Sequence, residues 1–181
     1  MKLYLVLYIA LLYSQVANAG SPAQADAAIQ LFNAACVQNM GANLESLGQW
    51  AKNQKLERID KQIEGRVLSG KPGTVWKATN QIGGYLLVFS EQSKCSIWAH
   101  ELDVNQLKQK FLEIIDGVKR PGLSVEKIGD ETLQAYVGRT KLLTFSVRKS
   151  SESSGFVFFV STNPDDPEIQ GRLTLSPYSN N

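Results

Sequence analysis

The apolar residues in the first part of the chain recur with the period of a helix. Ser21-Pro22-Ala23-Gln24 has the pattern of a capping box with proline at the first helical position. The apolar positions that follow are Ala25, Ala28, Ile29, Phe32, Cys36 and Val37. Their spacing predicts an amphipathic helix with Cys36 on its buried face, and Gly41 suits its C-terminal end.

A shorter helical pattern and a polar tract come next. Leu44, Leu47, Trp50 and Ala51 recur at helical spacing and predict a second helix. Residues 52–73 are mostly polar and end in Gly70-Lys71-Pro72-Gly73, which predicts a loop.

Beyond this tract the pattern changes to that of strands. Residues 74–78 predict a short strand, and the continuous apolar run at 85–89 suits a central strand. The polar residues 91–94 predict a turn that leads into a further strand at 95–99. We therefore expect a β-hairpin continued by a third strand.

One more helix separates these strands from the last third of the chain. Asp103 is a candidate N-cap, and Gly117 suits the end of the helix. Its apolar face consists of Val104, Leu107, Phe111, Ile114 and Ile115.

The last third of the chain has the alternation of β-strands. Apolar residues mark strands at 125–128, 133–137, 143–147, 156–160 and 173–175. The complete pattern predicts an α+β fold with two N-terminal helices, a β-hairpin, one helix and a C-terminal antiparallel β-meander.

The first nineteen residues have the pattern of a signal peptide. Lys2 gives a positive start, residues 3–13 are apolar, and Ala17-Asn18-Ala19 fits the cleavage pattern. An apolar run of about eleven residues is too short to cross a bilayer, which needs about twenty. We expect a mature chain of residues 20–181 that forms a single domain without an integral membrane segment. Its expected location is the periplasm, with secretion as the alternative.

The charges of the mature chain nearly balance. Lys2 is the one charged residue before Gly20, which leaves 18 Lys and Arg against 17 Asp and Glu. This balance does not favour nucleic acid as a partner. Cations are frequent between Lys52 and Lys77, where we expect a solvated face or, as the alternative, a docking surface for an acidic partner.

The chain has two cysteines, Cys36 and Cys95. In an exported protein an even count favours a disulfide, and two cysteines allow one pairing; the alternative is two buried thiols. Closing a loop of roughly 60 residues would stabilise the fold by about 4 kcal/mol in terms of loop-closure entropy. The sequence contains no Cys-x-x-Cys motif, so we do not expect a thioredoxin-like redox role.

Candidate residues for catalysis or metal binding are few. His100 is the only histidine, and no Gly-x-Ser-x-Gly motif accompanies it. Residues 65–71 match the start of a phosphate-binding loop, but Pro72 stands where Ser or Thr would ligate magnesium. The acidic loop at 165–168 lacks the alternation of an EF-hand. We therefore predict no catalytic residue, no metal site and no cofactor.

Three tryptophans, Trp50, Trp76 and Trp98, are candidate partner-binding residues, because tryptophan is favoured at interfaces. The alternative for each is packing in the core. On the strand at 95–99, Ile97 and Trp98 point to opposite faces. One of these two side chains therefore faces the outer side of the sheet unless helices cover both faces.

The order of several features along the chain also carries a resemblance. The features are Phe32 with Cys36, Gly48, Trp76, Cys95 and the helix at 104–115. In this order the chain resembles a loosely defined group of small exported proteobacterial proteins of unassigned function. The resemblance covers most of the mature chain as a pattern of elements and brings no catalytic motif with it.

Together these observations predict a soluble binding protein rather than an enzyme. We expect a periplasmic binding or inhibitor protein with a protein partner in the cell envelope, for example an immunity-type protein that neutralises an envelope-acting toxin. The tract at 52–73, the turn at 150–155 and any exposed tryptophan would form the contact surface. The alternative is an assembly or accessory factor of the envelope or of a secretion apparatus, and a hydrolase of envelope polymers is a third possibility.

Overall fold

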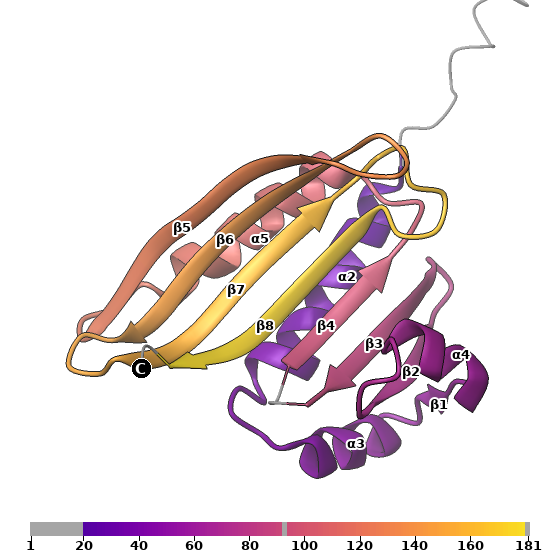
Figure 1. Ribbon diagram of the computed structural model, residues 1–181, viewed down its shortest axis with the longest axis horizontal. Helices are drawn as coiled ribbons and strands as arrows, with labels where there is room; N and C mark the ends of the chain where they lie inside the picture. The colour runs from indigo at the N-terminus through magenta and orange to yellow at the C-terminus, as the bar shows by residue number, and fades with distance from the viewer. Residues whose placement is uncertain (1–19, 92–93, 180–181) are drawn as a thin grey trace, which may run out of the picture.

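The computed structural model describes residues 20–91 and 94–179, which contain one eight-stranded antiparallel sheet (Figure 1). The strands are β1 (Glu57–Arg58), β2 (Gly73–Thr79), β3 (Gly84–Ser90), β4 (Lys94–Ala99), β5 (Leu123–Gln134), β6 (Arg139–Lys149), β7 (Ser154–Thr162) and β8 (Gly171–Ser179). Their order in the sheet is β1-β2-β3-β4-β8-β7-β6-β5, so the last strand pairs with β4. The predicted signal peptide, residues 1–19, lies outside the described residues.

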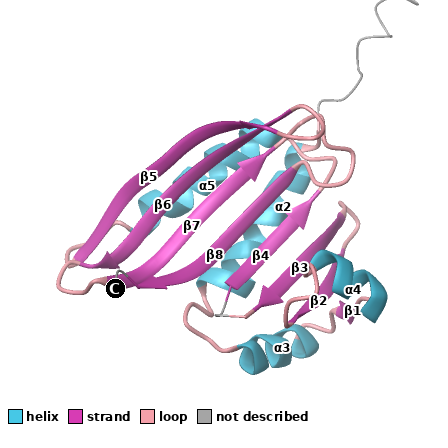
Figure 2. Ribbon diagram, viewed as in Figure 1, coloured by secondary structure: helices cyan, strands magenta, loops and turns pink. Residues whose placement is uncertain are grey.

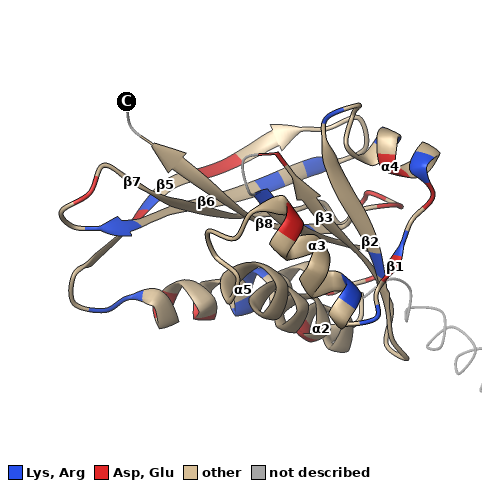
Figure 3. Ribbon diagram, turned by 90° about the horizontal axis from the view of Figure 1, so that it is seen from below, with Lys and Arg blue, Asp and Glu red and all other residues tan. Residues whose placement is uncertain are grey.

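Helices cover the two faces of this sheet unequally (Figures 2 and 3). The helical segments are α2 (Pro22–Phe32), its π-helical continuation η2 (Asn33–Val37), α3 (Leu44–Asn53), α4 (Lys61–Val67) and α5 (Val104–Val118). Of these, α2, η2, α3 and α5 pack on one face, here called the helical face. The short helix α4 packs on the opposite face, here called the open face, against β2. The arrangement confirms the predicted α+β class.

The main core lies between the sheet and the helical face. Leu87, Ile97 and Phe158 point from the strands toward Phe32 and Phe111, and each of these five side chains is at most 1% exposed. A second, smaller cluster lies on the open face, where α4 meets β2 and β3.

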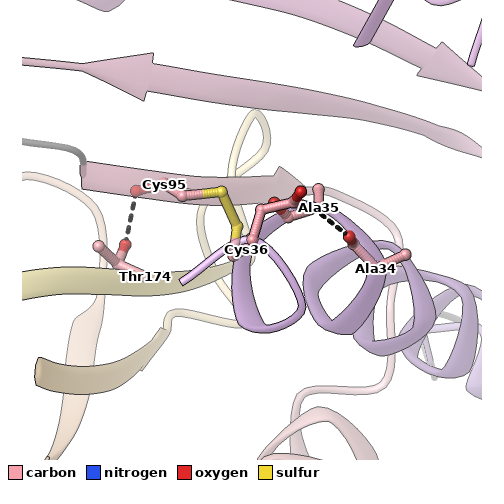
Figure 4. Close-up of a disulfide and its surroundings, with 7 residues drawn as sticks. Ala34, Ala35, Cys36, Cys95 and Thr174 are labelled. Atoms are coloured by element: carbon pink, nitrogen blue, oxygen red, sulfur yellow. Dashed lines mark hydrogen bonds between the residues drawn. A yellow bond between two sulfur atoms is a disulfide. The ribbon is translucent and has the colours of Figure 1, made fainter. Parts of the chain in front are cut away.

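A disulfide between Cys36 and Cys95 fastens η2 to β4, as predicted (Figure 4). The two Cα atoms are 5.5 Å apart, and both side chains are buried in the main core. Because β4 lies in the middle of the sheet, the crosslink holds the N-terminal helix against the strand that joins the two halves of the sheet.

The predicted capping box forms only in part. The Ser21 hydroxyl accepts a hydrogen bond from the Gln24 backbone N–H at 3.4 Å. The Gln24 side chain, however, donates to the Ile82 carbonyl at 2.9 Å, and the Ser21 N–H donates to the Glu101 carbonyl at 2.8 Å. Tertiary contacts thus replace the second half of the box.

The tract predicted as a loop at 52–73 contains a strand and a helix, so this prediction was wrong in part. Asp60 caps α4 by accepting from the Gln62 N–H at 2.7 Å. At the C-terminal end of α4, Val67 and Leu68 contact Val75 and Val88 on the open face. The helix is only seven residues long and strongly charged, so the hydrophobic pattern alone did not reveal it.

The alternating residues at 133–137 do not form a strand of their own. Strand β5 is a single element from Leu123 to Gln134, with a register shift between Lys127 and Gly129, and the chain then turns between Ala135 and Gly138. Tyr136 is fully exposed in this turn, and Leu133 is 48% exposed. The alternation here therefore does not reflect a buried face.

Candidate functional site

The open face between β3 and β7 presents two rows of side chains that cross four strands. Leu86, Trp98, Arg172 and Ser161 are successive cross-strand partners in the first row. The second row, two residues along each strand, consists of Val88, Ser96, Thr174 and Phe159. In the part of the chain that the structure describes, no helix other than α4 packs on this face.

Trp98 and Arg172 form a stacked pair at the centre of the first row. The Arg172 Cζ lies 4.0 Å from the centroid of the Trp98 ring, which is the geometry of a cation–π interaction. The neighbours of Trp98 on β4, Ile97 and Ala99, point into the main core and are buried. The pleat of β4 therefore forces Trp98 onto the open face, and it is half-buried there.

Arg172 is a partly desolvated cation without a counter-charge in contact. Its guanidinium forms no hydrogen bond or ion pair with the described residues, and the Arg172 Nε and the Trp98 Nε1 are buried without acceptors there. Burial lowers the pKa of the Arg172 guanidinium, and the charge of Asp166 opposes this shift. The Asp166 carboxylate instead accepts from the backbone N–H groups of Glu168 and Ile169. Taking a cation out of water is costly unless it is paired, so the arrangement favours an anionic ligand.

A groove of about 350 Å³ lies beside this pair. Its apolar lining includes Val88, Val157 and Phe159 from the strands and Val67 and Leu68 from the α4 side. The hydroxyl groups of Ser96 and Thr174 meet in the groove and are 2.8 Å apart.

The charged lining of the groove is entirely basic among the described residues. Lys71, Lys94 and Arg172 line it, and none of its lining residues is Asp or Glu. The two lysines are exposed, whereas Arg172 is half-buried. The groove therefore combines an apolar floor with three cations.

Two smaller hollows adjoin the Trp98–Arg172 pair. One, of about 190 Å³, lies on the Trp98 side and is lined by Lys77, His100 and Glu168, among others. The other, of about 170 Å³, lies on the Arg172 side and includes Asp166. Beyond the Trp98–Arg172 pair, the surface therefore carries both basic and acidic side chains, unlike the groove.

A buried carboxylate fixes the α4 wall of the groove. Glu64 accepts two hydrogen bonds from the Arg58 guanidinium, at 2.8 and 3.0 Å, and one from the Val75 backbone N–H at 3.0 Å. The hydrogen bonds from Arg58 lower the pKa of the Glu64 carboxyl, while desolvation opposes the shift. This contact ties α4 to both β1 and β2.

The structure places the three candidate tryptophans in different surroundings. Trp76 is 5% exposed in the main core, where its Nε1 donates to the Thr74 hydroxyl at 3.1 Å. Trp50 lies on α3 and packs partly buried against the same core. Of the three, Trp98 alone lies on the open face.

The sequence analysis did not identify Arg172 as a candidate, because only the pairing of β8 with β4 brings it to Trp98.

The remaining candidate residues lie at the edges of the fold. His100 is half-exposed beyond the end of β4, with its Nδ1 3.9 Å from a carboxylate oxygen of Glu101. Gly65 lies inside α4 rather than in a loop between a strand and a helix, as a phosphate-binding loop would require. The described residues contain no cluster of three or more His, Cys, Asp or Glu side chains suited to a metal ion.

Comparison with known proteins finds no matching family, no matching curated protein and no matching solved structure. Among the described helices, none has the length and apolar character needed to cross a membrane.

Proposed function

We propose that this protein is an exported binding protein that docks onto a protein partner through its open face and inhibits it. The observation that carries the proposal is the Trp98–Arg172 pair, a half-buried aromatic stacked on a partly desolvated cation. Tryptophan and arginine are the residues most enriched where binding energy concentrates at interfaces. A cation that the described residues leave unpaired gains a counter-charge when the partner binds.

The pair stands on paired strands that a disulfide crosslinks to the helical layer, which favours binding by a preformed surface. Trp98 and Arg172 stand on two paired central strands, and the disulfide at Cys95 fastens one of them to the helical layer. A side chain that is already ordered loses little conformational entropy on binding.

The location that we propose is the periplasm, with secretion as the alternative. The leader pattern at residues 1–19 supports export, and a buried disulfide suits an oxidising compartment. An immunity-type protein that blocks an envelope-acting toxin is the specific form of inhibitor that we favour, because it needs a rigid contact surface and no catalytic group.

A second candidate function is that of an envelope assembly factor that accepts a strand from its partner. Strand β5 is the last in the sheet, so the described residues leave its outer side without a neighbouring strand. A register shift between Lys127 and Gly129 interrupts this strand, and Ile128 is 53% exposed there. An edge strand without a neighbour is a known site for strand addition. The register shift makes regular pairing along this edge less favourable, which is why the open face is our first choice.

Site-directed photo-crosslinking in the cell envelope distinguishes the two. A photoreactive phenylalanine analogue replaces Phe159 on the open face, Ile128 on the β5 edge or, as the control, the exposed Gln49 on α3. Docking through the open face predicts a defined adduct from position 159 and none from 49. An adduct from position 128 alone would favour the assembly factor, and no adduct from position 159 would contradict the proposed function.

A further inference from the structure

We propose that the occupant of the open-face groove is an extended acidic segment of the partner protein, with a carboxylate at each end and an apolar side chain between them. This inference rests on the proposed function and specifies the chemistry of the partner.

The cations of the groove lie at its two ends. Lys94 is paired with Ser90, which is paired in turn with Gly73, two residues after Lys71, so both lysines lie at one end. Arg172 lies at the other end, opposite Trp98. Lys94 and Trp98 are four residues apart on β4, which separates their Cα atoms by about 13 Å.

The middle of the groove is neutral and partly apolar. The paired hydroxyls of Ser96 and Thr174 lie there, with Val88 on one side and Phe159 on the other. An aliphatic side chain would contact Val88 and Phe159. The two hydroxyls would form hydrogen bonds with backbone groups of the bound segment.

An extended peptide matches this spacing. Residues i, i+2 and i+4 of a strand point to the same side, and i and i+4 are about 13 Å apart. Asp or Glu at i and i+4 would therefore reach Lys94 and Arg172, and an apolar residue at i+2 would lie over the centre. Charge complementarity at both ends fixes the register of such a segment.

Other anionic ligands fit the groove less well. A fatty acid or another amphiphile with a single head group would pair with one end and leave the other cations unmatched. A nucleic acid strand would continue past Arg172, where Asp166 and Glu168 line the adjoining hollows.

The test is a titration of the disulfide-bonded chain of residues 20–181 with short blocked peptides, followed by NMR at the Trp98 indole N–H. The probes are Glu-Thr-Leu-Thr-Glu, its Gln-Thr-Leu-Thr-Gln analogue, and laurate. We expect saturable shifts with the first, and affinity weaker by about tenfold for each carboxylate replaced. Equal binding of both peptides, tighter binding of laurate, or no shift with the Glu peptide would overturn the inference.

Charge-reversal variants locate the binding site. K94E and K71E change exposed lysines at one end of the groove and should weaken binding of the Glu peptide by about tenfold or more. K52E, which changes an exposed lysine on α3, should leave the affinity for this peptide unchanged. Equal effects of K52E and K94E would contradict the groove as the site. If position 159 crosslinks to a partner whose contact segment lacks paired carboxylates, this inference fails while the proposed function stands.

Discussion

Arg172 on β8 stacks over Trp98 on β4, with its Cζ 4.0 Å from the ring centroid, and the two residues are direct cross-strand partners. The stacking holds the guanidinium against an aromatic surface, where it loses water without gaining a carboxylate among the described residues. Such a position stabilises the fold less than a paired cation would. It places on the open face a cation for which the described residues provide no paired anion.

Replacing Arg172 with an apolar residue should therefore cost little stability. We expect R172M to change the free energy of unfolding by no more than about 1 kcal/mol, because the lost cation–π contact is offset by the removal of a desolvated charge. As the matched comparison, F158A removes a fully buried ring from the main core and should cost about 3–5 kcal/mol. Urea denaturation measures both, and a loss for R172M as large as that for F158A would show that Arg172 is structural.

The Cys36–Cys95 disulfide should contribute strongly to stability. It closes a loop across a sequence separation of 59 residues, so its removal in the C36S/C95S double variant should lower the free energy of unfolding by about 4 kcal/mol. The same loss is expected when the wild-type chain is measured with a reductant. If reduction destabilises the double variant as much as it does the wild type, the effect does not arise from this bond.

The sequence predicted the main elements because their signals are local. The helical spacing from Ala25 to Cys36, the Asp103 cap and the apolar run at 85–89 each depend on neighbouring residues, and the corresponding elements are present. The Cys36–Cys95 pairing followed from the count of cysteines. The helix α4 was missed because its stability depends on Glu64 contacts with Arg58 and Val75, which belong to other elements.

The site was only half predictable. Strand alternation indicated that Trp98 and Ile97 face opposite ways, but it could not assign either face. Arg172 gave no local signal, because its role depends on β8 entering the sheet between β4 and β7. Pairing between strands so distant in sequence is set by the complete core and not by the residues near Arg172.

The anchoring of α4 should depend on pH through Glu64. The pKa of its carboxyl is lowered in the folded protein, so its contribution to stability is present above the pKa of the unfolded chain. As the pH falls from 7 to about 3, that contribution declines, and it is lost once the folded carboxyl is protonated.

The E64Q variant isolates this effect. It should be less stable than the wild type at pH 7, and the difference should shrink toward acid pH, because the glutamine cannot titrate. Urea unfolding of both proteins across this pH range measures it. A difference that stays constant with pH would contradict the assigned role of the carboxylate.

Gly48 lies in the interior of α3, and nothing lies within 4 Å of the position that a Cβ atom would take there. We expect G48A to raise the free energy of unfolding by about 0.5–1 kcal/mol, because alanine restricts the unfolded chain and favours the helix. The melting temperature should rise accordingly. A lower melting temperature would mean that this surface of α3 packs differently from the structure.

The most direct test of the binding surface uses R172M with the protein that crosslinks to the open face. The affinity of that partner for wild-type chain and for R172M is measured by calorimetry, with K52E as the control. Our account predicts that R172M stays within about 1 kcal/mol of the wild type in its free energy of unfolding but binds at least about tenfold more weakly, and that K52E binds like the wild type. Equal affinity of R172M and wild type would contradict the central role of the Trp98–Arg172 pair.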